Sequence, residues 1–288
     1  MAGTPELPLV RQLSSNSDPY RDPLARVRWA ELNLSHYWLP PEATSLYGTR
    51  QYEQLDERTR RLLSQYEFFG VIRSGLWFEA LFMQRLTARM SCELSLTRHA
   101  YLLHEVREEA GHSLMFLKLL ESSGLPLPDL HRARPRRLEQ AGRWLSVDGA
   151  LFWLAVLIGE DLPDKLNRYV RQQPEGTVNE AIRDVCLMHM IDEARHVAYA
   201  RKTVETRLAA AGALQRRVLP PLVRRLFAAF VETAFLPTAD LYELAGLAPG
   251  ARWRALARRN PHRQQFLARL LAPSIRLLEG YGFRVSLP

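Results

Sequence analysis

The chain has 288 residues, 47% of them hydrophobic, and two cysteines; this suits a large core without a disulfide framework and indicates a reducing, cytoplasmic location. The formal net charge is +8, but the arginines are spread along helical patterns and the basic clusters match no nucleic-acid motif, so we expect solvated helix faces and no nucleic-acid partner. The first thirty residues lack the apolar segment of a secretory signal, and the longest apolar run, at 151–159, is too short to cross a membrane.

The N-terminal part of the chain predicts little regular structure. Residues 1 to about 22 are polar and rich in proline and serine, which predicts an irregular arm. A short amphipathic stretch near 24–36 leads to a loop, WLPPEATSLYGT, with paired prolines and a glycine. We therefore expect residues 1–54 to form an arm with a short helix that packs on a helical domain of residues 55–288.

Long helical patterns fill the rest of the chain. We expect helices at about 55–90, 93–121, 137–172, 176–212 and 218–246, and one or two more in the C-terminal segment. Pro163 should kink or interrupt the third of these helices, which the basic loop HRARPRR precedes. Alternating strand patterns are nearly absent. The predicted fold class is all-α, a ferritin-like four-helix bundle with additional N- and C-terminal helices.

The stretch HMIDEARH, residues 189–196, places three metal-binding side chains on one stripe of a helix. Each residue of an α-helix turns about 100°, so His189, Glu193 and His196 fall within an arc of roughly 60°. Their neighbours along the stripe are mostly apolar. A carboxylate in such surroundings is costly unless a cation pairs with it.

A second Glu-x-x-His motif, Glu109 and His112, lies in the middle of the helix predicted at 93–121. One further carboxylate stands on the helix before each motif, Glu79 in GLWFEALFM and Glu160 at the end of LFWLAVLIGE. The spacing from Glu79 to Glu109 nearly equals that from Glu160 to Glu193. The sequence therefore predicts two similar helical hairpins, each with a glutamate on one helix and Glu-x-x-His on the next.

Two such hairpins that face each other gather four carboxylates and two histidines, the ligand set of a ferritin-like di-iron or di-manganese bundle. Two divalent cations neutralise the four carboxylates; without metal the acids repel one another and take up protons. Carboxylate oxygen with imidazole nitrogen favours iron, and manganese as the second choice, over structural zinc. We expect His189 to add one more nitrogen ligand, and the alternative is a core histidine hydrogen-bonded to an acid.

At these positions the chain resembles a known family, the di-iron arylamine N-oxygenases or p-aminobenzoate N-oxygenase family. The family pattern is Glu, Glu-x-x-His, Glu, and then His-x-x-x-Glu-x-x-His, and its extra histidine separates it from ferritins, rubrerythrins and ribonucleotide reductase small subunits. The resemblance covers about residues 55–240 and implies a ferritin-like bundle that binds two iron ions. The matching metal ligands are Glu79, Glu109, His112, Glu160, His189, Glu193 and His196.

The resemblance implies an enzyme that activates O₂ and oxidises an amine nitrogen to the hydroxylamine, nitroso or nitro level, with electrons from an external donor. It implies a natural-product pathway, a homodimer, and as substrate a free aryl amine or an amino group tethered to a carrier protein. The positive charge would suit an acidic carrier protein, although a merely basic surface explains the charge as well.

Two alternatives to this reading are open. One is another di-iron or di-manganese oxidase or hydroxylase that uses O₂ or peroxide, and the other is a non-catalytic metal-binding helical protein.

Several neighbouring residues compete for roles at the predicted site. Glu105 shares the stripe of Glu109 and either lies behind the ligands or points to solvent. Asp164 is a candidate to hydrogen-bond a ligand histidine. Glu108 and Asp192, each four residues before a histidine, are alternatives to the adjacent glutamates. Four apolar side chains are expected to be core and to keep water from the oxidant: Phe82, Met83, Phe116 and Trp153.

Overall fold

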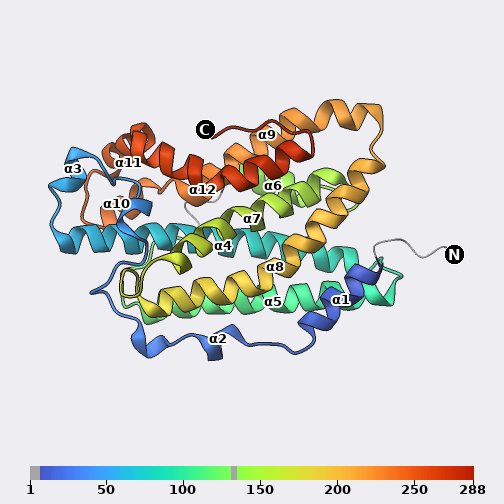
Figure 1. Ribbon diagram of the computed structural model, residues 1–288, viewed down its shortest axis with the longest axis horizontal. Helices are drawn as coiled ribbons and strands as arrows, with labels where there is room; N and C mark the ends of the chain where they lie inside the picture. The colour runs from blue at the N-terminus through green and yellow to red at the C-terminus, as the bar shows by residue number, and fades with distance from the viewer. Residues whose placement is uncertain (1–6, 131–134) are drawn as a thin grey trace.

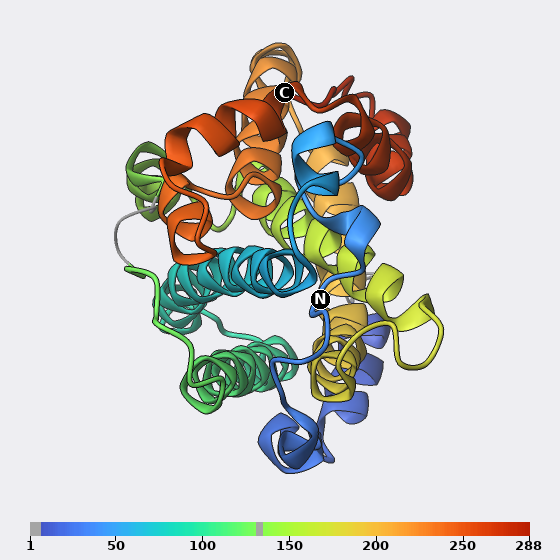
Figure 2. The ribbon, with the colours of Figure 1, turned by 90° about the vertical axis from the view of Figure 1, so that its left-hand side faces the viewer.

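The computed structural model describes residues 7–130 and 135–288, and the regular structure in these ranges is entirely helical. Four long helices form an antiparallel bundle (Figure 1), and Figure 2 looks nearly along their axes, with α4 beside α5 and α7 beside α8. They are α4 (Glu57–Met90), α5 (Leu96–Ser122), α7 (Ala150–Gln172) and α8 (Glu180–Ala209). The predicted all-α, ferritin-like bundle is confirmed. None of the described helices is long and apolar enough to cross a membrane.

Shorter helices cover two opposite sides of this bundle (Figure 1). On one side the N-terminal segment packs on α5 and α8 through α1 (Leu7–Ser17) and α2 (Pro23–Arg26), which two 3₁₀ turns and α3 (Arg50–Glu53) follow. On the other side α9 (Ala213–Phe235) packs on α7 and α4, and α12 (Pro261–Gly280) packs on α7. The remaining helices are α6 (Arg136–Trp144), α10 (Ala239–Leu244) and α11 (Gly250–Arg259).

Polar side chains fix the starts of three bundle helices. Asp56 accepts a hydrogen bond from the backbone N–H of Thr59 at the start of α4. Ser95 does the same for α5, and Asn179 for α8. These caps satisfy N–H groups that the first turn of a helix leaves without a partner.

The structure differs from the sequence-based prediction in four places. Residues 7–17 form helix α1 and not an irregular arm, because Val10 and Leu13 share one face that is buried in the core. The predicted helix at 137–172 is two helices, α6 and α7, with a break at 145–149. The predicted helix at 218–246 ends at Phe235, since the next proline disfavours helical backbone in the residue before it. Helix α7 continues through Pro163 without interruption. Residues 131–134 of the predicted basic loop lie outside the described residues.

A buried arginine joins the C-terminal helices to the N-terminal segment. Arg263 of α12 donates hydrogen bonds to the carbonyl oxygens of Ala43 (2.5 Å) and Phe235 (2.6 Å). Burial raises the pKa of the nearby Glu67 carboxyl, and the charge of Arg263 opposes that rise. Glu67 in turn accepts hydrogen bonds from the backbone and hydroxyl of Ser45. Arg263 is thus the cation that compensates a buried carboxylate.

Replacing this arginine is expected to destabilise the fold. Arg263→Ala removes two buried hydrogen bonds and leaves Glu67 without its compensating cation, which costs about 3 kcal/mol or more in the free energy of unfolding. Urea denaturation measures this loss. Arg259→Ala, at an exposed position of α11, is the control and should change the free energy by less than about 0.5 kcal/mol. Equal losses in the two variants would contradict the assigned role.

Candidate metal centre

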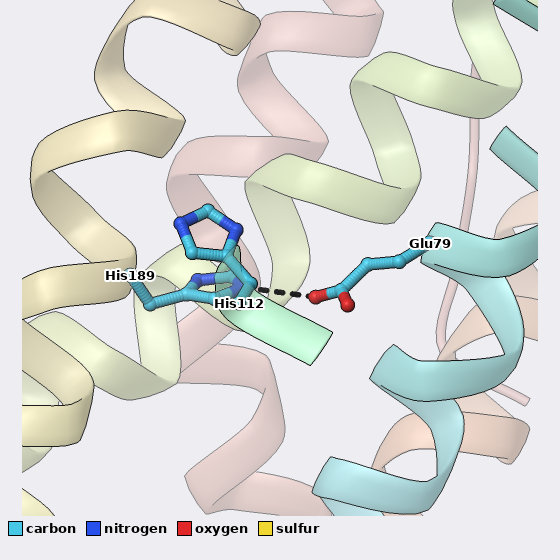
Figure 3. A group of neighbouring side chains, drawn as sticks. All are labelled: Glu79, His112 and His189. Atoms are coloured by element: carbon cyan, nitrogen blue, oxygen red, sulfur yellow. Dashed lines mark ion pairs between the residues drawn. The ribbon is translucent and has the colours of Figure 1, made fainter. Parts of the chain in front are cut away.

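The seven residues predicted as ligands all point into the interior of the bundle, and all are buried. Helix α4 contributes one glutamate, α5 a Glu-x-x-His pair, α7 one glutamate, and α8 the His-x-x-x-Glu-x-x-His run. Figure 3 shows Glu79, His112 and His189 reaching toward one another from three of these helices. The structure therefore brings together every one of the predicted positions.

Two groups of three residues have potential ligand atoms within 4.8 Å of one another. One group is Glu79, His112 and His189, and the other is Glu109, His112 and Glu193. Nε2 of His189 lies 3.7 Å from Oε1 of Glu79 and 3.5 Å from Oε1 of Glu193. Nδ1 of His112 lies 3.5 Å from that same Glu193 oxygen. The Glu193 carboxylate thus stands at the centre of the cluster.

The two remaining residues complete the cluster around Glu193. Nδ1 of His196 lies 3.0 Å from Oε1 of Glu109 and 3.6 Å from Oε1 of Glu193. Burial and the charge of the nearby Glu193 raise the pKa of the Glu160 carboxyl well above its usual value, so Glu160 lies next to Glu193 in the cluster.

Most of the inward-facing polar atoms have no hydrogen-bond partner among the described residues. They are both carboxylate oxygens of Glu109 and Glu193, one oxygen each of Glu79 and Glu160, and Nδ1 of His112 and His196. Buried polar atoms are otherwise nearly always hydrogen-bonded. A set of carboxylate and imidazole atoms that face one another closely, without hydrogen bonds between them, fits cation binding, and these ligand types suit iron or manganese.

The outward nitrogens of the histidines are held by acids of the opposite helix. Nε2 of His112 on α5 lies 3.2 Å from Oδ2 of Asp192 on α8. Nε2 of His196 on α8 lies 3.0 Å from Oε2 of Glu108 on α5. Arg195 donates hydrogen bonds to both acids. This crossed arrangement fixes the imidazole rings so that Nδ1 faces the cluster.

These contacts decide roles that the sequence left open. Glu108 and Asp192 lie behind the histidines, so they do not compete with the adjacent glutamates for the centre. Asp164 does not contact a histidine; it pairs with Lys165 and Arg168 on its own helix. The amide of Asn167 instead lies 3.1 Å from Nδ1 of His189, a contact that the sequence analysis missed.

The carboxylates of the cluster shift the pKa values of the histidines that face them. Burial alone would lower the pKa of the His112 imidazole, but the hydrogen bond with Asp192 and the charges of Glu109 and Glu193 raise it well above its usual value. Carboxylates raise the pKa of His196 in the same way. Nearby carboxylates therefore favour the protonated form of both histidines.

Glu105 is a further buried acid close to this cluster. It is fully buried, and neither of its carboxylate oxygens has a hydrogen-bond partner among the described residues. The possibility that it points to solvent is therefore wrong. Burial is the main cause that raises the pKa of Glu105 to about 8.

Two adjacent cavities lie on one side of the cluster. The inner one, with about 50 Å³ of free volume, is bounded by Glu79, Glu160 and His189 and is otherwise mostly apolar. The ring of Phe116 stacks on His189 with centroids 5.4 Å apart, so it covers this side of the cluster. An outer cavity of about 260 Å³ shares five lining residues with the inner one: Val71, Ser74, Trp77, Thr233 and Ala234.

The apolar residues that the sequence analysis singled out have different surroundings. Phe82, Phe116 and Trp153 are buried in the core as expected, whereas Met83 is only half-buried. Of the four, only Phe116 lines the inner cavity.

This combination of fold and site defines a class, the ferritin-like helical proteins whose bundle interior gathers carboxylate and histidine side chains. Residues 9–282 match the family described as P-aminobenzoate N-oxygenase AurF, and the chain belongs to that family. The match covers nearly the whole chain. The resemblance based on the sequence motifs covered only about residues 55–240.

Two kinds of known protein are similar to this chain. Uncharacterized proteins of Mycobacterium tuberculosis and Mycobacterium bovis are 28% identical over 216 residues, which cover 70% of this chain and 59% of those proteins. The chain thus matches about three fifths of the length of these relatives. A solved R2-like ligand-binding oxidase with an aerobically reconstituted Mn/Fe cofactor has a TM-score of 0.54 at 13% identity, over 98% of this chain and 94% of the other. The same oxidase after photoconversion has a TM-score of 0.54 at 14% identity, over 99% and 95%. At this identity the likeness shows the fold.

The buried Glu105 predicts a pH dependence of the stability of the metal-free protein. The folded state keeps this proton up to about pH 8, whereas the unfolded chain releases it near an ordinary pKa of about 4.3. The folded state binds this proton more tightly between these values, so the contribution of Glu105 to the stability is fully present below about pH 4.3 and is lost as the pH rises toward 8. Glu105→Gln should flatten this part of the profile of unfolding free energy against pH.

Glu205→Gln, at an exposed position near the end of α8, serves as the control and should keep the wild-type slope. An unchanged slope in Glu105→Gln would show that this carboxyl titrates normally.

Proposed function

We propose that the protein is a di-iron N-oxygenase, which activates O₂ and oxidises an amine nitrogen in a biosynthetic pathway. The observation that carries this proposal is the set of buried carboxylate and imidazole atoms that face one another without hydrogen-bond partners, beside a mostly apolar cavity. Membership of the N-oxygenase family supports the same reaction.

The proposed ligands of the two iron ions are the residues whose donor atoms meet in the bundle. Hard carboxylate oxygens with imidazole nitrogens suit iron or manganese, and two divalent ions would neutralise the four carboxylates. A mixed Mn/Fe centre, as in the similar R2-like oxidase, is the alternative that metal analysis tests. The ligands are Glu79, Glu109, His112, Glu160, His189, Glu193 and His196.

Metal ions bound by these residues would supply the electrons for the reduction of O₂. The chain itself orients and shields this chemistry. Asp192 and Glu108 hold two imidazoles from behind, and Asn167 holds a third. Phe116 stacks on His189, and the mostly apolar lining of the inner cavity limits water around the reacting nitrogen.

The two adjacent cavities provide the proposed route for the amine. Helices α4 and α9 contribute the residues that the two cavities share, so the substrate would enter between these helices. We propose as substrate a free aryl amine or an amino group tethered to a carrier protein, with electrons from an external donor. The net positive charge suits an acidic carrier protein. A cytoplasmic homodimer remains part of this proposal.

A second candidate function is another oxidase or hydroxylase that uses O₂ or peroxide on the same centre. The likeness of the fold to an R2-like ligand-binding oxidase favours it. The two candidates differ in whether an amine gains oxygen.

Asp192→Asn should weaken metal binding without changing a proposed ligand. Asparagine keeps the shape of the side chain but lacks the charge that holds Nε2 of His112, and loss of such a partner typically lowers metal affinity about 10- to 100-fold. Competition with a chelator measures the affinity for ferrous iron or manganese. Asp148→Asn, at a surface salt bridge remote from the cluster, should bind metal as the wild type does. Equal affinities for the two variants would refute the role of Asp192.

Reconstitution with ferrous iron tests the reaction itself. We expect about two iron ions per chain, and O₂ consumption that depends on an added amine and yields hydroxylamine, nitroso or nitro products by mass spectrometry. Aryl amines and aminoacyl carrier proteins are assayed in parallel, and Glu193→Ala, which removes the central carboxylate, should bind little iron and form no product. O₂ or peroxide consumption without an oxidised amine would favour the second candidate. A wild-type chain that binds no metal would contradict both.

A further inference from the structure

Three buried aromatic side chains form a contact chain from three different helices. The ring of Tyr101 on α5 lies 4.5 Å from that of Tyr199 on α8, and the ring of Tyr199 lies 5.1 Å from that of Trp153 on α7. All three side chains are at most 5% exposed. The chain of rings is therefore continuous and shielded from water along its length.

The inner end of this chain reaches the backbone beside a proposed metal ligand. The hydroxyl of Tyr101 donates a hydrogen bond to the carbonyl oxygen of Arg195 at 3.4 Å, and Arg195 directly precedes His196. Glu105 lies one turn after Tyr101 on the same face of α5, with both oxygens buried and unpartnered. Tyr101 is thus linked to the His196 segment and has a carboxyl group near its phenol.

The outer end of the chain lies at a surface cavity. A polar cavity of about 230 Å³ is lined by both Trp153 and Tyr199. Charged side chains surround these rings, among them Asp148, which pairs with Arg89 and Arg207 at 3.3 Å each. This cavity shares no lining residue with the two adjacent cavities on the side of Glu79 and His189. A small polar molecule at this site would be near Trp153 and separate from the substrate route.

The residue types matter as much as their contacts. Tyrosine and tryptophan lose one electron to a strong oxidant far more readily than phenylalanine does, because the phenol and indole rings are electron-rich. Packing alone would be satisfied by phenylalanine, which is the residue type at 116, where a ring covers His189 on the substrate side. Oxidisable rings in contact allow an electron to move stepwise between them.

We propose that Trp153, Tyr199 and Tyr101 form an electron relay from the surface cavity to the metal centre, which reduces the oxidised centre when no amine is bound. The inference rests on the proposed function, since the oxidant is the metal centre after it has reacted with O₂. Its benefit is that oxidising equivalents leave the bundle before they damage the ligands.

Each passage is the transfer of one electron from Trp153 through Tyr199 and Tyr101 to the centre, and electrons and protons balance in it. The centre gains one electron, and the Trp153 indole loses one. Tyr101 and Tyr199 are oxidised and re-reduced in turn as the electron deficit moves outward. Each phenol proton is displaced when its ring loses the electron and returns when the electron is regained, so neither tyrosine changes its protonation state over one passage. A small thiol in the outer cavity then reduces Trp153. Two passages convert two thiols into one disulfide, with two protons released to water.

The first test follows the radicals. Iron-loaded, reduced full-length protein is mixed with O₂ without amine, frozen within milliseconds to seconds, and examined by electron paramagnetic resonance. The wild type should show a tryptophan radical signal, and Tyr199→Phe should lose it because phenylalanine interrupts the relay. Tyr66→Phe, at another buried tyrosine outside the chain of rings, should behave as the wild type does. Identical spectra from the wild type and Tyr199→Phe would overturn the proposal.

The second test needs neither O₂ nor an amine, so it separates the relay from the proposed reaction. Cys92 is exposed, while Cys186 is buried, and Cys92 lies between Arg89 and Glu93 of the outer cavity. A photosensitiser attached to Cys92 is excited by a flash under anaerobic conditions and oxidised by an added soluble electron acceptor, and the oxidation of ferrous iron that follows is measured by absorbance. Tyr199→Phe and Trp153→Phe should each slow it by about an order of magnitude.

Equal rates of iron oxidation in all variants would overturn the relay even if amines are oxidised normally. Slowed rates in a protein that oxidises no amine would support the relay and contradict the N-oxygenase reaction.

Discussion

The structure depends on the burial of four mutually repelling carboxylates in the apolar interior of a helical bundle. Ionised acids in such surroundings are very unfavourable unless opposite charge is close. Neighbouring carboxylates raise the pKa values of Glu160, His112 and His196, so protons bound there are one source of that charge. Two divalent cations would provide it with fixed geometry, which protons cannot do. The four buried carboxylates are therefore best explained as a site for cations.

The hydrogen bonds behind the cluster hold its histidines in fixed positions. Arg195 joins Glu108 and Asp192, and each of these acids holds the histidine of the opposite helix, so α5 and α8 are joined twice across a near-symmetric arrangement. Arg195 also donates a hydrogen bond to the hydroxyl of Ser17 in α1 at 2.9 Å. Helix α1 thus contacts Arg195, the residue that positions both acids behind the histidines. The four bundle helices therefore do not contain all the contacts that hold the cluster in place. A rigid support limits how far the imidazoles can turn when metal binds or leaves.

The sequence was sufficient to predict that the seven proposed ligands face one another inside the bundle, but not to predict which residues hydrogen-bond the histidines. Glu109 with His112, and His189 with Glu193 and His196, lie on one helix each, so helical spacing alone places them on a common face. The partners of the histidines cross between helices, and no spacing within one helix reveals that Asp192 faces His112. Asn167 was missed for the same reason. The stretch DEARH, with an arginine one residue before the histidine, was the available signal for the crossed arrangement.

The predicted ends of the peripheral helices were wrong for a different physical reason. The stretch around Gly149 has a helical pattern on both sides, and its break follows from how α6 packs on α4 and α7 on α8. Helix α1 lies in a polar segment, and its burial depends on α5 and α8, which are distant in sequence. Such outcomes are set by tertiary contacts, whereas bundle helices with strong apolar stripes are set locally.

The most direct test of the central claim is anomalous diffraction at the iron absorption edge from crystals of the iron-loaded protein. Two neighbouring peaks within the bundle, contacted by carboxylates of all four long helices and by the three histidines, are the predicted result. No peak in the bundle interior, or peaks only at the protein surface, would contradict the account.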